Sequence, residues 1–330
     1  MPKNIVILFD GTWNDSITRS TDTNIHMLDM MISPQNQGKE YFPGVGENVG
    51  WINRRLWGAV GKGVFETARR GWRFIARNYV DGDKIYVFGF SRGAYAARHL
   101  AGMVVRYGVK GYQGNIEIGF REYIKNCGTP CEVKKHTVHF LGLFDCVPAN
   151  YLYLLRDRSF HLNSHILEDG ILNFRHAVST LERRYSFRPI LFEKGKQETF
   201  AQHWFPGYHS DVGGHKDNSR GLASFSLWWM IREAYGLGLD FDVVDCRYHH
   251  FGNGIPVVQN IDLEDKPICS DYFTTKLGIR WDRAKRESTV IPDKTPELYE
   301  LTKCPRCGKE MFDIPFTDDE RKRLIELGLL

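Results

Sequence analysis

The feature that most constrains the fold is a serine flanked by glycines at the junction of two different sequence patterns. The segment GFSRG at 89–93 ends the β-rich apolar run KIYVFGF and precedes the alanine-rich run AYAARHLAG. A serine on a sharp strand-to-helix turn needs small neighbours two residues away on either side, which glycine supplies. The pattern predicts a nucleophile elbow that presents Ser91 at the end of a strand. A glycine-rich loop with an incidental serine is the alternative.

Short apolar runs alternate with helical patterns on both sides of this segment, as expected for a mostly parallel sheet flanked by helices on both faces. The sequence therefore predicts an α/β architecture. We expect one catalytic domain over residues 1–300, with an irregular pattern at 235–300, and a short tail at 301–330. The expected strands are 5–9, 84–90, 138–144 and 200–205, and the expected helices are 23–32, 63–78, 94–106 and 222–235.

Composition excludes several other classes of protein. Hydrophobic residues at 42% and charged residues at 25% are typical of a soluble globular chain, and a net charge of +4 does not indicate nucleic-acid binding. No apolar run approaches the roughly 18 residues of a membrane-spanning helix. We expect a cytoplasmic protein, with export by a dedicated secretion system still open. Seven cysteines, an odd number, favour reduced thiols over a disulfide framework.

A serine becomes nucleophilic only beside a base that an acid orients, and both have candidates downstream. Asp145 follows the run VHFLGLF, which places its carboxylate at the same edge of the sheet as Ser91. His209 lies in the turn-rich segment WFPGYHSDVGG, which we expect to form a loop. The order Ser, Asp, His is that of the α/β-hydrolases. Asp211 is the rival orienting acid, or alternatively a residue that caps the turn.

The oxyanion of an ester hydrolysis needs backbone donors near the nucleophile. The Arg92 amide, at the start of the helix after Ser91, is the first candidate. The segment FDGTWN at 9–14 follows the first strand and brings the Gly11 and Thr12 amides to the same edge. Asp10 is either a supporting residue of this site or the anchor of an ordinary turn.

Five blocks of the sequence, in order, resemble a known family. They are FDGTWND, GDKIYVFGFSRGAYAARHLAG, FLGLFDCV, HAVSTLERRYSFRPILF and WFPGYHSDVGG, between residue 9 and residue 214. The chain is similar to the α/β-hydrolase-like domains of unknown function family 2235, which includes the catalytic domain of the first family of type VI secretion lipase effectors. The resemblance implies an α/β-hydrolase-like fold, Ser91, Asp145 and His209 as a triad, and phospholipase activity.

Two further segments suggest binding sites. Residues 51–78 carry seven basic residues against one acid, with aromatic residues interleaved, so a peripheral contact with an anionic membrane is one interpretation and an ordinary amphipathic helix is the other. Cys304 and Cys307 form a C-x-x-C that could hold structural zinc together with Cys127 and Cys131, or could remain free thiols.

We therefore expect a serine hydrolase that cleaves a lipid or phospholipid acyl ester through an acyl-enzyme, with no cofactor required for catalysis. Its partner would be a small-molecule ester or a phospholipid, and not nucleic acid. One alternative is a metal-assisted hydrolase built on Asp10, His209 and Asp211. Another is a non-catalytic binding protein on the same fold.

Overall fold

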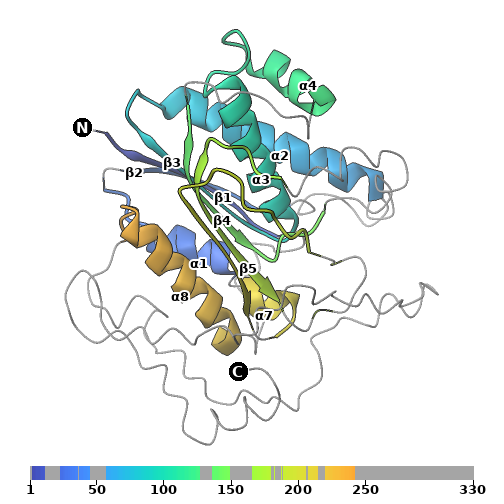
Figure 1. The fold of residues 1–330 in the computed structure, drawn as a ribbon, viewed down its shortest axis with the longest axis vertical. Coiled ribbons are helices and arrows are strands. Elements are labelled where there is room, and N and C mark those ends of the chain that lie inside the picture. The colour runs from blue at the N-terminus through green and yellow to red at the C-terminus, as the bar shows by residue number, and fades with distance from the viewer. Residues whose placement is uncertain are drawn as a thin grey trace, which may run out of the picture.

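Figure 1 shows the computed structural model of the chain. The structure describes residues 2–11, 23–35, 37–44, 57–126, 136–148, 166–179, 182, 187, 189–205, 207–214 and 220–241, with the backbone alone at 57–62, 220–222, 224, 225 and 228.

Six strands form one sheet in the order β2-β1-β3-β4-β5-β6, and every neighbouring pair is parallel. Because all strands run in the same direction, their carboxyl ends meet at one edge, which is where parallel sheets place their sites. The strands are β1 (Asn4–Phe9), β2 (Gln37–Phe42), β3 (Lys84–Phe90), β4 (Val138–Phe144), β5 (Ile171–Ser179) and β6 (Thr199–Phe205).

Helices cover both faces of this sheet (Figure 1). On one face α2 (Trp57–Asn78) and α3 (Arg92–Tyr107) pack against Ile5, Ile7 and Phe9 of β1, and α4 (Ile116–Asn126) packs on these two helices. On the other face α1 (Asn24–Met31) packs on β1 and β3, and α8 (Arg220–Gly236) packs on β4 and β5, in a core that includes Val6 and Leu8 of β1. Alternate residues of β1 thus enter two separate cores, as a strand buried on both faces requires.

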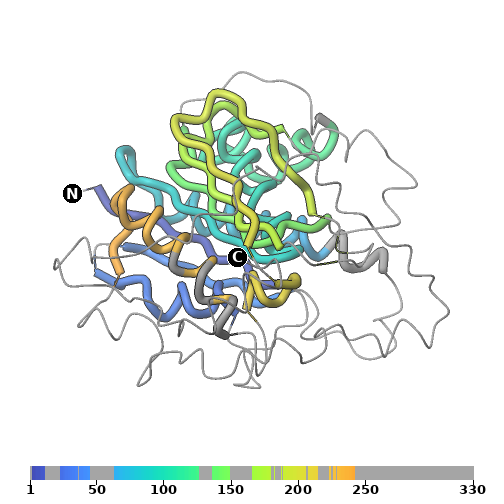
Figure 2. Tube along the Cα trace, turned by 60° about the horizontal axis from the view of Figure 1, so that its bottom comes forward, coloured from blue at the N-terminus to red at the C-terminus, as the bar shows by residue number. Residues whose placement is uncertain are grey.

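The two helices on the second face lie side by side, as Figure 2 also shows in its turned view. The Asn24 side-chain amide of α1 donates to the Ala223 carbonyl of α8 and to the carbonyl of Val212. Val212 belongs to α7 (His209–Gly213), the short helix that follows β6. This buried amide therefore ties the second helical layer to the carboxyl edge of the sheet.

The expected α/β architecture with a parallel sheet and helices on both faces is confirmed. β3 and β4 have the predicted bounds, β1 and β6 begin one residue earlier, and the four expected helices are present. The sequence prediction missed β2, β5, α4 and the short helix α7 (His209–Gly213). The boundary expected at residue 300 and the irregular region at 242–300 lie outside the described residues and remain predictions.

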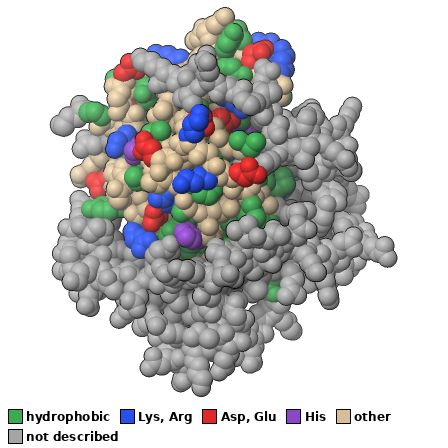
Figure 3. Space-filling view, in the orientation of Figure 1, with side chains coloured by type: hydrophobic (Ala, Val, Ile, Leu, Met, Phe, Trp, Pro, Cys, Tyr) green, Lys and Arg blue, Asp and Glu red, His purple; other side chains and the backbone are tan. Residues whose placement is uncertain are grey.

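The described surface mixes charges of both signs. In Figure 3, basic and acidic side chains alternate over the coloured part of the face shown. Within the part of the chain that the structure describes, no helix is both long enough and apolar enough to cross a membrane.

Candidate active site

Ser91 lies on the sharp turn between β3 and α3. Its backbone has φ 58° and ψ −124°, a conformation that costs a non-glycine residue free energy. A Cβ on Gly89 would lie 2.5 Å from the Gly93 carbonyl oxygen, and one on Gly93 would lie 2.3 Å from the Phe9 carbonyl oxygen. Both flanking glycines are therefore required by the closeness of neighbouring backbone, which is the geometry that the G-x-S-x-G pattern predicted.

The side chains of Ser91, His209 and Asp145 meet at the carboxyl edge of the sheet. His209 Nε2 is 2.8 Å from Ser91 Oγ, and His209 Nδ1 is 2.6 Å from Asp145 Oδ2. All three residues are buried, with 4%, 5% and 0% of their surface exposed in that order. A carboxylate can only accept, so Nδ1 carries the imidazole proton and Nε2 is left as an acceptor for the serine hydroxyl.

The Asp145 carboxylate is held by the end of the neighbouring strand β5. The Ser179 amide donates to its Oδ1 at 3.0 Å, and the Ser179 hydroxyl donates to its Oδ2 at 3.1 Å. Asp145 itself has φ 37°, so the chain turns sharply as it leaves β4. Ser179 was missed in the sequence analysis, because nothing in the sequence predicted the strand that carries it.

A second buried pair fixes the backbone beyond Asp145. The Cys146 amide donates to His176 Nε2 at 3.0 Å. His176 Nε2 is therefore unprotonated, so Nδ1 is the donor to Gln202 Oε1 at 2.9 Å. Two polar side chains of β5 and β6 thus stabilise the turn that presents the acid, and sequence analysis missed both.

His209 begins a short helix, α7, and does not lie in the loop that the sequence predicted. Asp211 Oδ2 accepts from the Tyr208 amide at 2.7 Å and closes the first turn of this helix. Glu182 is also buried here, and its carboxylate accepts a hydrogen bond from the His209 amide at 3.4 Å. Burial, with a smaller contribution from the nearby Glu182 carboxylate, raises the pKa of Asp211 to about 6 against the lowering effect of the Tyr208 amide.

These contacts assign different positions to the two candidate acids. Asp145 contacts the imidazole, whereas Asp211 contacts the backbone as a cap. The sequence analysis missed Glu182. In the sequence this residue is followed by two arginines, and nothing in that pattern predicts a buried acid that binds the His209 amide.

Asp10 accepts hydrogen bonds from three donors among the described residues, and these bonds fix the loop after β1. Its donors are the Thr23 hydroxyl at 2.6 Å, the Tyr41 hydroxyl at 2.6 Å and the Gly11 amide at 2.6 Å. The Gly11 amide, expected to receive an oxyanion, thus already has an acceptor in this structure. The geometry favours the turn-anchoring interpretation of Asp10. Thr12 lies outside the described residues.

The Arg92 amide occupies the first position of α3, directly after Ser91. The first amides of a helix have no partner within the helix, and the helix dipole adds positive charge there. Of the two expected oxyanion donors within the described residues, the Gly11 amide donates to Asp10, whereas the Arg92 amide lies at the start of α3 beside Ser91.

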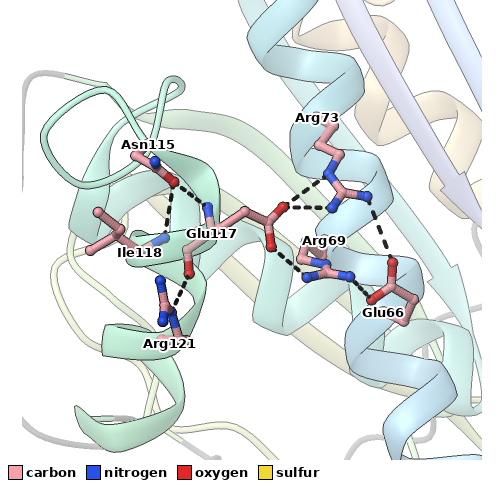
Figure 4. Close-up of polar contacts among 7 residues, drawn as sticks. All are labelled: Glu66, Arg69, Arg73, Asn115, Glu117, Ile118 and Arg121. Carbon is pink, nitrogen blue, oxygen red and sulfur yellow. Dashed lines mark hydrogen bonds and ion pairs between the residues drawn. The ribbon is translucent and has the colours of Figure 1, made fainter.

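Two arginines of the basic segment 51–78 are engaged within the protein. Arg69 and Arg73 of α2 bind Glu117 of α4 and Glu66 of α2 in a network of two positive and two negative charges (Figure 4). The pKa of Glu117 is lowered chiefly by its hydrogen bond with Arg73. These contacts favour an amphipathic helix packed on its neighbours over a free lipid-binding face at 63–78. Residues 51–56 lie outside the described residues.

The expected zinc ligands Cys127, Cys131, Cys304 and Cys307 also lie outside the described residues. Among the residues that are described, no group of three or more His, Cys, Asp and Glu side chains is arranged to hold a metal ion.

A parallel α/β sheet with a nucleophile elbow and a Ser–His–Asp contact at its carboxyl edge defines an α/β-hydrolase-like protein. The particular family follows from comparison with known proteins. The chain belongs to the family described as "T6SS, Phospholipase effector Tle1-like, catalytic domain", whose model matches residues 3–233.

Individual proteins also resemble the chain. "Uncharacterized protein YEL023C" of Saccharomyces cerevisiae is 31% identical over 230 residues, covering 58% of this chain and 33% of that protein. An uncharacterized protein from Pseudomonas aeruginosa matches in its crystal structure with a TM-score of 0.44 and 18% identity, over 73% of this chain and 47% of that one. The Tle1 effector bound to the VgrG spike of the type 6 secretion system matches with a TM-score of 0.42 and 22% identity, over 66% and 51%. The chain thus spans about a third of the curated relative and about half of each solved structure.

Proposed function

We propose that this protein is a serine hydrolase that cleaves an acyl ester of a lipid, with a phospholipid as the preferred class of substrate. The observation that carries the mechanism is the His209 ring, which bridges Ser91 Oγ and Asp145 Oδ2 at hydrogen-bonding distance on both sides. The lipid part of the proposal is supported by the family description, which names a phospholipase effector.

The arrangement supports a two-step acyl transfer. Ser91 Oγ attacks the ester carbonyl while His209 Nε2 takes the hydroxyl proton, and Asp145 stabilises the resulting imidazolium. The Arg92 amide donates to the oxyanion of the tetrahedral intermediate. Return of the proton from His209 to the leaving alcohol yields an acyl-serine, and a water activated by His209 then releases the fatty acid.

Contacts already made within the site favour this route over a metal-assisted one on Asp10, His209 and Asp211. Both ring nitrogens of His209 are engaged, by Asp145 and by Ser91. Asp10 accepts from three protein donors, and Asp211 closes the first turn of α7. The three side chains thus have separate tasks and do not converge on one point.

The family description also names a secretion system. We include export by such a system in the proposal, with the cytoplasmic location expected from the sequence as its alternative. In either case the substrate is drawn from a lipid surface, and the described chain supplies the triad that cleaves it.

The test of this proposal is Ser91→Ala, with Ser33→Ala at the end of α1 as the matched control outside the site. A fluorophosphonate should label wild type and the Ser33 variant, and should not label the Ser91 variant. Hydrolysis of short-chain soluble esters and of phosphatidylglycerol vesicles should fall by roughly 10⁴-fold or more in Ser91→Ala alone. Wild-type turnover by a folded Ser91→Ala protein would refute the serine mechanism, and the absence of label and turnover in wild type would favour a binding protein. Cleavage of soluble esters without phospholipid hydrolysis would refute the lipid assignment only.

A further inference from the structure

Arg92 is the first residue of α3 and directly follows the nucleophile. Residues 92, 95 and 99 follow the i, i+3, i+7 spacing of one helix stripe, and the rings of Tyr95 and His99 contact Phe65 of α2 with centroid distances of 6.2 and 4.9 Å. Arg92 occupies the same stripe at its Ser91 end. Because Cα–Cβ bonds tilt toward the amino end of a helix, the side chain of Arg92 starts toward the carboxyl edge of the sheet.

The other two arginines of α3 are matched by an acid, whereas Arg92 is not. Arg98 and Arg106 both pair with the buried Glu168, at 2.9 and 3.1 Å. Arg92 makes no ion pair with any acid in the described ranges of the chain. The same helix thus carries two guanidinium groups that share one carboxylate, and one guanidinium that forms no ion pair with the described acids.

The acids of this edge are already engaged by other donors. Asp145 accepts from His209 and Ser179, and Asp211 accepts from the Tyr208 amide. Their hydrogen bonds hold the imidazole and the turn before it. These two carboxylates, and that of Glu182 beside His209, form no ion pair with Arg92, so the Arg92 charge has no paired acid among the described residues of this edge.

The surroundings of Arg92 make this charge costly. The residue is only partly exposed, and burial lowers its pKa to about 10, so the side chain remains protonated at neutral pH. A cation withdrawn from water without a counter-charge costs free energy that a bound anion would recover. A guanidinium presents several donors in one plane, which suits the oxygens of a phosphate.

We propose that the Arg92 side chain binds the phosphate of the substrate while the ester carbonyl lies at Ser91 Oγ and the Arg92 amide. This inference rests on the proposed function and makes Arg92 a specificity-determining residue of the same site. The enzyme then selects acyl esters that carry a phosphate within the reach of one arginine side chain from the scissile bond. Neutral acylglycerols lack that group and lose the interaction.

The experiment compares two soluble substrates that differ in the phosphate, dihexanoyl phosphatidic acid and dihexanoylglycerol, each kept below its aggregation concentration. Wild type, Arg92→Gln and Arg92→Lys are measured with Arg77→Gln, which removes an exposed arginine of α2, as the control for charge. The ratio of kcat/KM for the phosphate ester to that for the neutral ester should fall on the order of 10- to 100-fold in Arg92→Gln, as expected when a charge-assisted hydrogen bond is lost. Arg92→Lys should retain part of the ratio, and Arg77→Gln should retain all of it.

A binding measurement separates this inference from the proposed function. Calorimetry with hexyl phosphate needs no turnover and should show weaker binding to Arg92→Gln than to wild type by a similar factor, with no such change in Arg77→Gln. An unchanged kcat/KM ratio in Arg92→Gln, or equal hexyl phosphate affinity, would overturn the role of Arg92. Failure of the proposed function would instead appear as wild-type turnover in Ser91→Ala, whatever the affinity for hexyl phosphate.

Discussion

Replacement of Asp145 by Asn exchanges one carboxylate oxygen for an NH₂ group and tests whether Asp145 orients the His209 imidazole. In the structure, Asp145 Oδ2 faces His209 Nδ1 at 2.6 Å, and Oδ1 accepts from the Ser179 amide at 3.0 Å. The Ser179 amide requires an acceptor, so an Asn at 145 keeps its oxygen there. Its NH₂ group then faces His209 Nδ1.

A donor facing Nδ1 forces the imidazole into the opposite tautomer. Nδ1 becomes the acceptor, Nε2 carries the proton, and Nε2 can no longer take a proton from Ser91 Oγ. The loss of the base and of the charge that stabilises the imidazolium should lower kcat by about 10⁴-fold. That factor corresponds to about 5 kcal/mol of transition-state free energy.

Asp211→Asn is the matched control, because it makes the same chemical change two residues from His209. Its side-chain oxygen can still accept from the Tyr208 amide, so the cap of α7 remains and the loss of activity should stay within about tenfold. Rates with a soluble ester are compared after thermal unfolding shows that both variants are folded. A larger loss in Asp211→Asn, or an Asp145→Asn variant that keeps most of its activity, would refute the assignment of the orienting acid.

Two further predictions concern stability. Burial raises the pKa of Asp211 from 3.8 to about 6, so between these pH values the folded protein holds a proton that the unfolded chain has released. The free energy of unfolding should therefore fall by about 3 kcal/mol as pH rises through that window. Asp211→Asn should remove this dependence in denaturant titrations, and parallel pH profiles of the variant and wild type would contradict it. The hydrogen bond with Arg73 lowers the pKa of Glu117, so the contribution of Glu117 to stability is present at neutral pH and lost in acid. Because this side chain is 43% exposed, Glu117→Gln should lower the free energy of unfolding in urea by about 0.5–1 kcal/mol. Glu122→Gln, which disrupts an exposed pair with Lys125, should lower it by less.

Three of the four predicted strands, β1, β3 and β4, are buried on both faces. β3 and β4 are buried almost throughout, and their sequences show it directly. β2 lies at the edge of the sheet with mostly half-buried residues, and its sequence QGKEYF has no apolar pattern. β5 is buried but carries polar groups satisfied by distant partners, such as Arg175 bound to Glu233 of α8. Such partners are known only once the chain has folded.

The same contrast between strands with an apolar pattern and strands without one explains which site residues could be predicted. Ser91 and Asp145 directly follow predictable strands, so their meeting at one edge could be expected. The structure adds that Ser179 and Glu182 hold the acid and the base, and their roles depend on a strand and a turn that local sequence does not specify. Gly11 was predicted at the correct edge, but its amide donates to the Asp10 carboxylate, which the sequence did not predict.

The chain order of the triad has a consequence for the protein during its synthesis. Ser91 and its base are separated by 118 residues, and the acid and base by 64. At 5 to 20 residues per second, a ribosome needs roughly 6 to 24 s to pass from the nucleophile to the histidine. Throughout that interval the serine has no base, because a contact between such distant residues forms only after the intervening strands have been made and paired. Under the proposed mechanism, a nascent or truncated chain that ends before β6 therefore lacks the base, and we expect hydrolytic activity to report completion of the sheet.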